Sequence, residues 1–503
     1  MIEIQCRRRK CGNMARDVLL DSIRIENFKA FRDTGVVPLK PITLLVGKNS
    51  AGKSSLIKAI LACMQHSQSS SPPDQSDFPL IGNQTNLGTF EETIHANNTD
   101  KIFSFSFGLP SPIPTPIFKP EEDLDFNNEI YTIRYSYGRN HISPIGVKLV
   151  GVEATAKGKT LIKSTGFNQH TNARGRLKGI TWNKKQIFSD GDSFDESMLR
   201  YTNFSLQEDE VLDVNDLKVR VFLDTSGFGL HTRMHYVGTN IQRSMFNRFG
   251  IGFNPNNAIG NFESSTLACE SLLSRARYIG PLREEPTRES RLAQSSGNRI
   301  GTRGEDLSSM LHIRRDNEEF MDKFNKNLQM FGIADTATTA ASYMKVKKGV
   351  KEEEIETGYI QILIEKDGTF RSLMDLGFGT SQVLPIIFQL SLRRNRLLIL
   401  EQPELHLHPA AQLEIGNLLK FAIEQGNQII AETHSANMIE RLRSLIRSGE
   451  LTKDDVNIVY ISKDSDGSSR CDIIGFNDDG TFDDTWPEDD FFGEREQEIF
   501  SNW

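Results

Sequence analysis

The sequence predicts an α/β protein, and three observations lead to this class. The apolar run PITLLVG at residues 41–47 is typical of a strand buried on both faces, and the helical pattern SSLIKAILACM follows it after a glycine-rich turn. Two later apolar runs, LLILE and QIIAE, are also typical of buried strands, and each is followed by a polar motif. The stretch from about 100 to 260 is β-rich, with alternating side chains and strand patterns such as KIFSFSFGL and KVRVFLD.

Length and composition set the class of protein. The chain has 503 residues, 37% of them hydrophobic and 25% charged, which is ordinary for a soluble globular protein of two to four domains. Its formal net charge of −8 excludes a protein that coats nucleic acid with its whole surface, so any DNA contact must be local. Five scattered cysteines without a C-x-x-C motif suggest no zinc site and fit a reduced, cytoplasmic chain. No apolar run is long enough to span a membrane, so no membrane partner is expected.

Loop-forming residues and changes in hydrophobic periodicity divide the chain into segments. The basic cluster RRRK near the start lies before the first expected strand, LLDSIRIENF; we expect a flexible tail there, and the alternative is a nucleic-acid contact. Residues 66–79 are expected to form a mobile loop, and residues 358–371 a hairpin with an Asp-Gly turn. Residues 264–345 are expected to be mostly helical, with interruptions at YIGPLREEPTR and IGTRGEDL. The expected segments are a flexible extension (1–17), an N-lobe with the phosphate loop (18–100), a β-rich lobe or insertion (101–263), a helical subdomain (264–357), a C-lobe (358–475) and an acidic C-terminal block (476–503).

The turn after the first buried strand matches the phosphate-loop pattern G-x-x-x-x-G-K-[ST] in full, from Gly47 to Ser54. Its glycines let the backbone wrap phosphates, while loop amides and the helix N-terminus supply positive potential. We expect Lys53 to reach the β- and γ-phosphates of ATP and Ser54 to bind Mg²⁺ through its hydroxyl; a plain glycine turn is the alternative. The residues expected to contact the nucleotide are Asn49, Ser50, Ala51, Gly52, Lys53, Ser54 and Ser55.

An acidic motif follows the strand LLILE. Compared with ABC-type ATPases, Glu401 stands where an aspartate usually orders magnesium, and Gln402 stands where the catalytic glutamate usually stands. A glutamine amide can position a water molecule but cannot take its proton, so Glu404 is a possible substitute base and turnover is expected to be slow. His406 and His408 could form a metal pair, but loop or interface contacts are the favoured interpretation.

Two further motifs complete the pattern. His434, after the strand QIIAE, suits a residue that senses the γ-phosphate; the alternative is a capping histidine before the next helix. The segment LGFGTSQ, with Gly379, Ser381 and Gln382, precedes the apolar pattern VLPIIFQL and suits small residues with a Ser/Thr cap that present amides to an anion. A simple helix cap is the alternative. In ABC-type ATPases such a signature completes the site of the other subunit, so we expect a head-to-tail homodimer, or a higher even oligomer, around two ATP molecules.

The motifs IRIENFKAF, VGKNSAGKSSL, YIGPLREEPTR, GTRGEDL, GFGTSQVLPI, LEQPELHLHP, AETHS and WPEDDFF occur in this order. Together they resemble a bacterial family of SMC/ABC-like ATPases related to the ATPase half of the OLD nucleases and to the ATPase subunit of the Septu anti-phage system. The resemblance implies an ABC/SMC-type P-loop ATPase head with a β-rich lobe and a helical subdomain. It also implies an effector nuclease in a separate partner, because only 69 residues follow His434 and the Toprim nuclease domain of the OLD proteins has no counterpart here.

The resemblance also suggests roles for four residues. Phe28 and Arg32 lie where the N-terminal strand of SMC-like heads approaches the nucleotide, Arg283 is expected to face the interface or the phosphates, and Gln84 is a candidate for the magnesium shell. Three functions compete: an ATPase switch in a defence complex, a DNA repair ATPase of the RecF type that itself clamps DNA, and a transporter cassette. The long inserted lobe and the closing WPEDDFF block argue against the transporter.

Overall fold

The structure is a computed structural model that describes residues 18–68, 78–110, 131–139, 147–156, 268–292, 299–348, 351–392, 395–483 and 486, together with the backbone of seven strands between residues 159 and 237. The expected N-terminal extension and most of the acidic C-terminal block lie outside these residues. No helix in the described part of the chain is long and apolar enough to cross a membrane.

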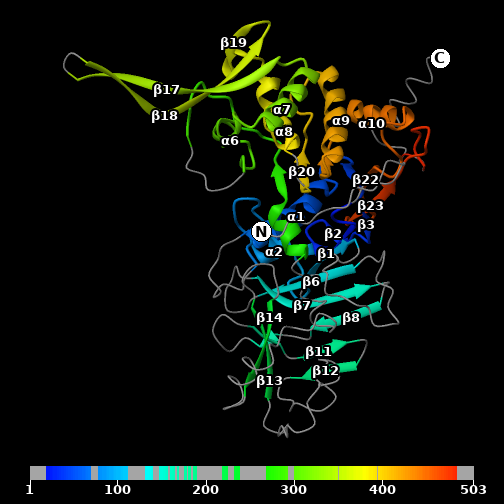
Figure 1. The fold of residues 1–503 in the computed structure, drawn as a ribbon. Helices are drawn as coiled ribbons and strands as arrows, with labels where there is room; N and C mark the ends of the chain where they lie inside the picture. The colour runs from blue at the N-terminus through cyan, green and yellow to red at the C-terminus, as the bar shows by residue number, and fades with distance from the viewer. Residues whose placement is uncertain are drawn as a thin grey trace, which may run out of the picture.

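A six-stranded sheet forms the centre of the protein (Figure 1). Its first five strands are parallel, and the last is antiparallel to its neighbour. The two strands that carry the acidic and histidine motifs lie side by side, and the strand of the phosphate loop is next to them, so the three motifs meet at one edge of the sheet. In spatial order the strands are β15 (Arg277–Ile279), β20 (Leu397–Glu401), β21 (Gln428–Glu432), β4 (Ile42–Val46), β22 (Val456–Lys463) and β23 (Ser469–Ile474).

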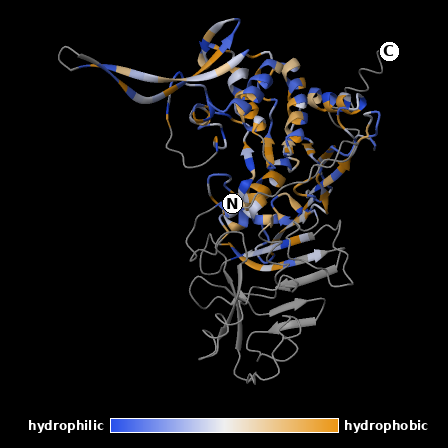
Figure 2. Cartoon of the chain, in the orientation of Figure 1, coloured by the Kyte–Doolittle hydropathy of each residue, from blue (hydrophilic) through white to orange (hydrophobic). Residues whose placement is uncertain are grey.

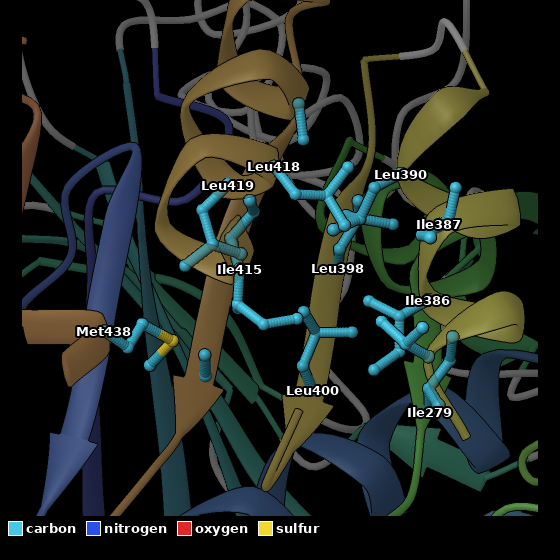
Figure 3. Packing of buried hydrophobic residues seen from close by; sticks show 14 of the residues in the cluster. Ile279, Ile386, Ile387, Leu390, Leu398, Leu400, Ile415, Leu418, Leu419 and Met438 are labelled. Carbon is cyan, nitrogen blue, oxygen red and sulfur yellow. The ribbon is translucent and has the colours of Figure 1, made fainter. Parts of the chain in front are cut away.

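Alternate side chains of the central strands enter two different cores. Leu45, Leu397 and Ile399 pack with helix α1 (Lys53–Gln68) in one core, while Leu398 and Leu400 enter the other. Figure 3 shows this second core, in which Leu398 and Leu400 lie between side chains of neighbouring helices, and Figure 2 shows hydrophobic residues concentrated on the central strands. The helices that contribute to the second core include α8 (Phe378–Ser391), α9 (Pro409–Glu424) and α10 (Ala436–Arg447).

A nine-stranded antiparallel sheet packs beyond α1 and contains the N-terminal strand. The strands expected in the β-rich stretch are all present, because their alternating side chains suit a sheet. Their bounds are β1 (Ser22–Phe28), β2 (Phe31–Asp33), β3 (Val37–Pro38), β5 (Phe103–Leu109), β6 (Tyr131–Arg139), β7 (Val147–Ala156), β8 (Lys159–Ser164), β11 (Gly179–Trp182) and β12 (Lys185–Ser189). A separate four-stranded sheet joins β9 (Phe167–Asn168), β10 (Gly175–Leu177), β13 (Lys218–Asp224) and β14 (His231–Val237). Short helical turns α2 (Phe90–Thr93) and η1 (His95–Asn97) precede β5.

The structure differs most from the predicted fold in residues 264–345, which were expected to be mostly helical. This segment contains a helix at residues 268–275, α6 (Leu307–Arg314) and α7 (Glu318–Met330), but also β15, β16 (Ser290–Arg291) and β17 (Thr336–Lys348). The alanines of β17 favour a helix, yet Ala337 and Thr339 are buried two residues apart, which is the period of a strand.

The strand β17 pairs with β18 (Lys351–Lys366) to form a long hairpin that extends from the head (Figure 1). The base of this hairpin is buried through Ala337, Ile362 and Ile364, whereas Tyr343 and Met344 farther along it are exposed. The strand β18 then turns at Asp367 and Gly368 into β19 (Thr369–Ser372), which confirms the predicted Asp-Gly hairpin. A short η3 turn (Leu373–Asp375) leads from β19 into α8.

Candidate nucleotide-binding site

Two glycines allow the phosphate loop to form between β4 and α1. Gly47 has φ of +143°, and a Cβ atom there would lie 2.1 Å from the carbonyl oxygen of Ile461 on β22. Gly52 has φ of +121°, and its Cβ would lie 2.6 Å from Oγ of Ser469 on β23. Both positions therefore require glycine, for conformation and for the close approach of the neighbouring strands.

The lysine of the loop is fixed in place. Lys53 is 4% exposed, and its Nζ donates hydrogen bonds to the carbonyl oxygens of Gly47 at 2.7 Å and Lys48 at 2.9 Å. The ammonium group thus bridges the loop from within. Residues 48–50, at the top of the loop, are exposed, as is Ser54 in the first turn of α1. The top of the loop and Ser54 are therefore accessible to a ligand, as phosphate binding requires.

Two glutamates end neighbouring strands at this loop. Glu401 ends β20 and Glu432 ends β21, and the two residues are directly paired in the parallel register. The hydroxyl of Ser54 donates to Oε2 of Glu432 at 3.4 Å, and the hydroxyl of Tyr278 donates to Oε1 of Glu401 at 2.8 Å. Glu432 and Tyr278 are site residues that the sequence motifs did not identify.

The carboxylates of Glu401 and Glu432 place two negative charges close together. Burial raises the pKa of Glu401, and burial together with the charge of Glu401 raises the pKa of Glu432 to about 7. A hydroxyl and carboxylate oxygens are the donors that Mg²⁺ prefers, and it completes its shell with water and phosphate oxygens. These residues therefore fit a magnesium ion held by Ser54 and Glu401. Bound magnesium would neutralise the charge that develops on transferring phosphates. Within the described ranges, no group of three or more His, Cys, Asp or Glu side chains is arranged to hold a metal.

The loop after β20 is held through its backbone. Gln402 has φ of +45°, a strained value for this residue type, and its amide donates to the carbonyl oxygen of Glu432 at 2.8 Å. Arg283 is 3% exposed and donates to the carbonyl oxygens of Glu401 at 2.8 Å and Gln402 at 3.0 Å. Burial lowers the pKa of Arg283 to about 10. The expectation that Arg283 faces an interface or the phosphates is therefore wrong, because its guanidinium is used to fix this loop.

Glu404 and His434 link this loop to the segment after β21. Oε1 of Glu404 accepts a hydrogen bond from the backbone amide of His434 at 2.7 Å, and burial raises the pKa of Glu404. The His434 side chain is exposed at the end of the central sheet, where a phosphate sensor would need to be. The cap of α10 is Ser435, whose Oγ accepts from the amide of Met438, so the alternative of a capping His434 is wrong.

Comparison with known proteins shows the family of the chain. The AAA ATPase domain family matches residues 19–439, most of the chain. The chain belongs to the AAA ATPase domain family. A 78-residue stretch is 33% identical to the Old nuclease of Escherichia phage P2, which is 16% of this chain and 11% of that relative's length.

Among solved structures, the head domains of SMC proteins are similar at 10–12% identity. An Smc head bound to the C-terminal winged-helix domain of ScpA aligns with a TM-score of 0.39 over 91% of this chain and 98% of that chain. A head with an extended coiled coil, bound to the C-terminal domain of ScpA from Pyrococcus furiosus, gives 0.39 over 96% and 99%. The SMC head of Thermotoga maritima gives 0.32 over 92% and 100%.

The signature segment of this AAA ATPase differs in detail from the expectation. Helix α8 already begins at Phe378, with Gly377 as its N-cap, so the expected Ser/Thr cap is wrong. Ser381 lies inside the helix, is buried and donates to the carbonyl oxygen of Phe378 at 2.7 Å; Gln382 is buried as well. What this segment can offer an anion is therefore the backbone amides at the start of the first turn, before that of Thr380, which donates to the carbonyl oxygen of Gly377. Gly379 packs against the loop after β20, where a Cβ would lie 2.8 Å from the carbonyl oxygen of His406.

The two histidines of that loop make local contacts. Nδ1 of His408 accepts from the amide of Ala410 and caps α9, while the ring of His406 packs against Phe378 with centroids 5.1 Å apart. These contacts agree with the interpretation of His406 and His408 as residues that make loop contacts rather than a metal pair.

Besides that of Arg283, two more of the roles suggested by the resemblance are wrong. Gln84 hydrogen-bonds Gln68 and Gln65 near the last turns of α1, about 20 Å along that helix from the phosphate loop. Phe28 is fully buried against Phe103 and Phe105, so its ring contacts core residues rather than a nucleotide.

The turn between β1 and β2 does reach the phosphate loop, but through another residue. Ala30 lies 3.3 Å from the position of a Cβ on Gly52. Arg32 is exposed beside this turn and pairs with Asp466 at 3.2 Å. Asp466 belongs to the turn of the β22–β23 hairpin, which agrees with the interpretation of the D-x-D sequence there as a turn.

Proposed function

We propose that this chain binds ATP with Mg²⁺ and hydrolyses it slowly, and that ATP drives it from a monomer to a head-to-tail homodimer. The observation that carries the proposal is the convergence of Lys53, Ser54, Glu401 and the exposed His434 at the carboxyl edge of one parallel sheet. A chain with one phosphate loop and one signature helix needs a second copy to enclose each nucleotide between these elements.

Light scattering tests the switch. The mass of the purified protein is measured without nucleotide, with ADP, and with a non-hydrolysable ATP analogue and magnesium. Growth to a dimer or larger even assembly with the analogue supports the proposal when Lys53→Ala abolishes it and Lys326→Ala, an exposed control on α7, does not. A mass that is the same under all conditions contradicts the switch.

We further propose that the ATPase acts in the cytoplasm as part of an anti-phage complex whose nuclease is a separate subunit. The resemblance to the Septu ATPase subunit and the short match to the Old nuclease support this role. Phage plating on bacteria that carry the native locus tests it. We expect Lys53→Ala to remove protection, and deletion of the neighbouring genes to do the same. Protection by this chain alone would contradict the separate effector.

A group of arginines favours a second candidate, an ATPase that itself binds DNA. Arg277 starts β15 and Arg396 directly precedes β20, so both lie at the amino edge of the central sheet, opposite the phosphate loop. Burial, and then the charges of Arg396 and Arg299, lower the pKa of Arg277 to about 9, and the exposed Arg275 lies two residues away. Clustered arginines of this kind suit a phosphate backbone.

Fluorescence anisotropy with a labelled DNA duplex at two salt concentrations tests this candidate. We expect the double change Arg275→Ala and Arg299→Ala to weaken DNA binding and to reduce its salt dependence, while Arg371→Ala, an exposed control on β19, leaves both unchanged. Equally strong DNA binding by the wild type, the double variant and the Arg371→Ala control would show that this group of arginines does not bind DNA.

A further inference from the structure

We infer that Glu432 is a second carboxylate ligand of the magnesium ion, beside Ser54 and Glu401. The inference rests on the proposed ATPase function and adds a residue that the motif pattern of the site does not supply. It follows from strand order, from the contact made by Ser54, and from the charge balance of the buried glutamate.

Strand order brings Glu432 closer to the phosphate loop than Glu401. The strand β21 lies between β4 and β20, so Glu432 is paired with Leu45 on the phosphate-loop strand, and Glu401 lies one strand farther away. Neighbouring strands are about 4.8 Å apart, so Glu401 starts about 10 Å from the phosphate-loop strand. An ion held by the first turn of α1 therefore has the Glu432 carboxylate as its nearer acidic neighbour.

The hydroxyl that is expected to bind the metal already points to Glu432. Oγ of Ser54 lies 3.4 Å from Oε2 of Glu432, at the long limit of a hydrogen bond. Among the hydrogen bonds of the described residues, the carboxylate contacted by Ser54 is that of Glu432, while Glu401 receives the hydroxyl of Tyr278. A cation that binds the Ser54 oxygen would thus meet Oε2 of Glu432 directly.

Burial and charge give Glu432 a reason to need a cation. It is 5% exposed and lies beside a second carboxylate, and no ion pair within the described ranges joins it to a lysine or arginine. The positive charge of Lys53 acts on Glu432, and Nζ of Lys53 also donates hydrogen bonds to two loop carbonyls. Two adjacent carboxylates at one buried position are costly, and a divalent cation beside Ser54 would add positive charge next to both of them.

Two other roles for Glu432 give different results. As a purely structural acceptor for Ser54, it could be replaced by glutamine without loss of metal affinity, because the amide oxygen also accepts a hydrogen bond. As a general base, its replacement would lower turnover and leave metal affinity unchanged. The Glu404 carboxylate is held toward the segment after β21, because its Oε1 accepts a hydrogen bond from the amide of His434 at 2.7 Å.

The test measures metal binding directly. Mn²⁺ is titrated into the full chain saturated with a non-hydrolysable ATP analogue, and free Mn²⁺ is followed by electron paramagnetic resonance. We expect Glu432→Gln to lower Mn²⁺ affinity about tenfold or more, Glu432→Asp to retain part of it, and Glu440→Gln on the exposed face of α10 to leave it unchanged. Circular dichroism confirms that each variant is folded, and the aspartate variant keeps the test decisive if the glutamine variant does not fold.

Nucleotide binding without metal separates this inference from the proposed function. A fluorescent ATP analogue in the presence of EDTA should bind the wild type and Glu432→Gln equally well. Mn²⁺ affinity within twofold of the wild type in Glu432→Gln would overturn the inference and, with reduced turnover, would indicate a base instead. Failure of the wild type to bind the nucleotide at all would instead remove the proposed ATPase function.

Discussion

The carboxylate of Glu404 accepts a hydrogen bond from the backbone amide of His434 at 2.7 Å, and this bond connects the loop after β20 to the segment after β21. The bond is partly buried, and both of its partners lie within a few residues of the paired glutamates at the strand ends. A change at Glu404 therefore alters the position of the candidate phosphate sensor as well as the local charge.

This bond gives Glu404 a positioning role that can be separated from a role as base. We expect Glu404→Gln to keep most of the ATP turnover, because its amide oxygen still accepts the His434 amide, and Glu404→Ala to lose about tenfold or more. Steady-state phosphate release measures both. An equal, large loss in the two variants would show that the carboxylate takes the proton, and no loss in either would exclude both roles.

The wild-type turnover number is expected to be below about 1 s⁻¹. Gln402 cannot accept a proton from water, and general-base catalysis is worth about 10²–10⁴-fold. Gln402→Glu should raise turnover, because it places a carboxylate on a backbone that Arg283 and Glu432 already fix. Hydrolysis by the wild type at tens per second would contradict this prediction.

Replacement of Lys53 by alanine should remove detectable nucleotide binding. The side chain supplies the positive charge that bridges the loop carbonyls of Gly47 and Lys48, so its loss removes both the ligand for phosphate and the brace of the loop. Titration with a fluorescent ATP analogue measures the effect, with Lys326→Ala, an exposed lysine on α7, as the control. Thermal melting of each variant shows whether the loop change has altered the fold.

The stability of the metal-free protein should depend on pH through Glu432. Its pKa in the folded protein is about 7, above the usual value of about 4.5 in an unfolded chain, so the folded state binds this proton more tightly. The stabilisation is present at low pH and is lost as pH rises through about 7. Relative to Glu432→Gln, we expect the wild-type free energy of unfolding to be about 1 kcal/mol higher at about pH 6 than at about pH 8, measured by urea unfolding in EDTA. A constant difference would mean that the carboxyl titrates normally.

Short-range pattern was enough to predict the elements that carry the site. The buried runs of β4, β20 and β21 and the spacing of α1 are strong local signals, and the phosphate-loop motif directly names Lys53 and Ser54. Glu401 follows from its place at the end of an apolar strand. These features depend on residues close together in the chain, so one sequence is sufficient to find them.

The rest of the site depends on strand order, which local pattern does not encode. Glu432 meets Ser54 because β21 is inserted between β4 and β20, and Tyr278 meets Glu401 because the edge strand β15 is added beside β20. A signal was nonetheless present, since LLILE and QIIAE end in the same residue at the same place in the strand. The start of α8 was misplaced because Gly377 and Gly379 are typical of a turn, although the second of them lies within a helix.

The hairpin of β17 and β18 is a long arm that is anchored at one end only. Its longer strand has 16 residues, which corresponds to about 50 Å of extended chain, and only its base is embedded in the core that also holds α8. A rotation of a few degrees at the base would move the far end by several ångströms, so a small shift of α8 that reached the base would become a large displacement at the far end. Spin labels at Lys347 and Glu440 would record this amplification as a nucleotide-dependent change in distance, and an unchanged distance would show that the arm and the helices move as one body.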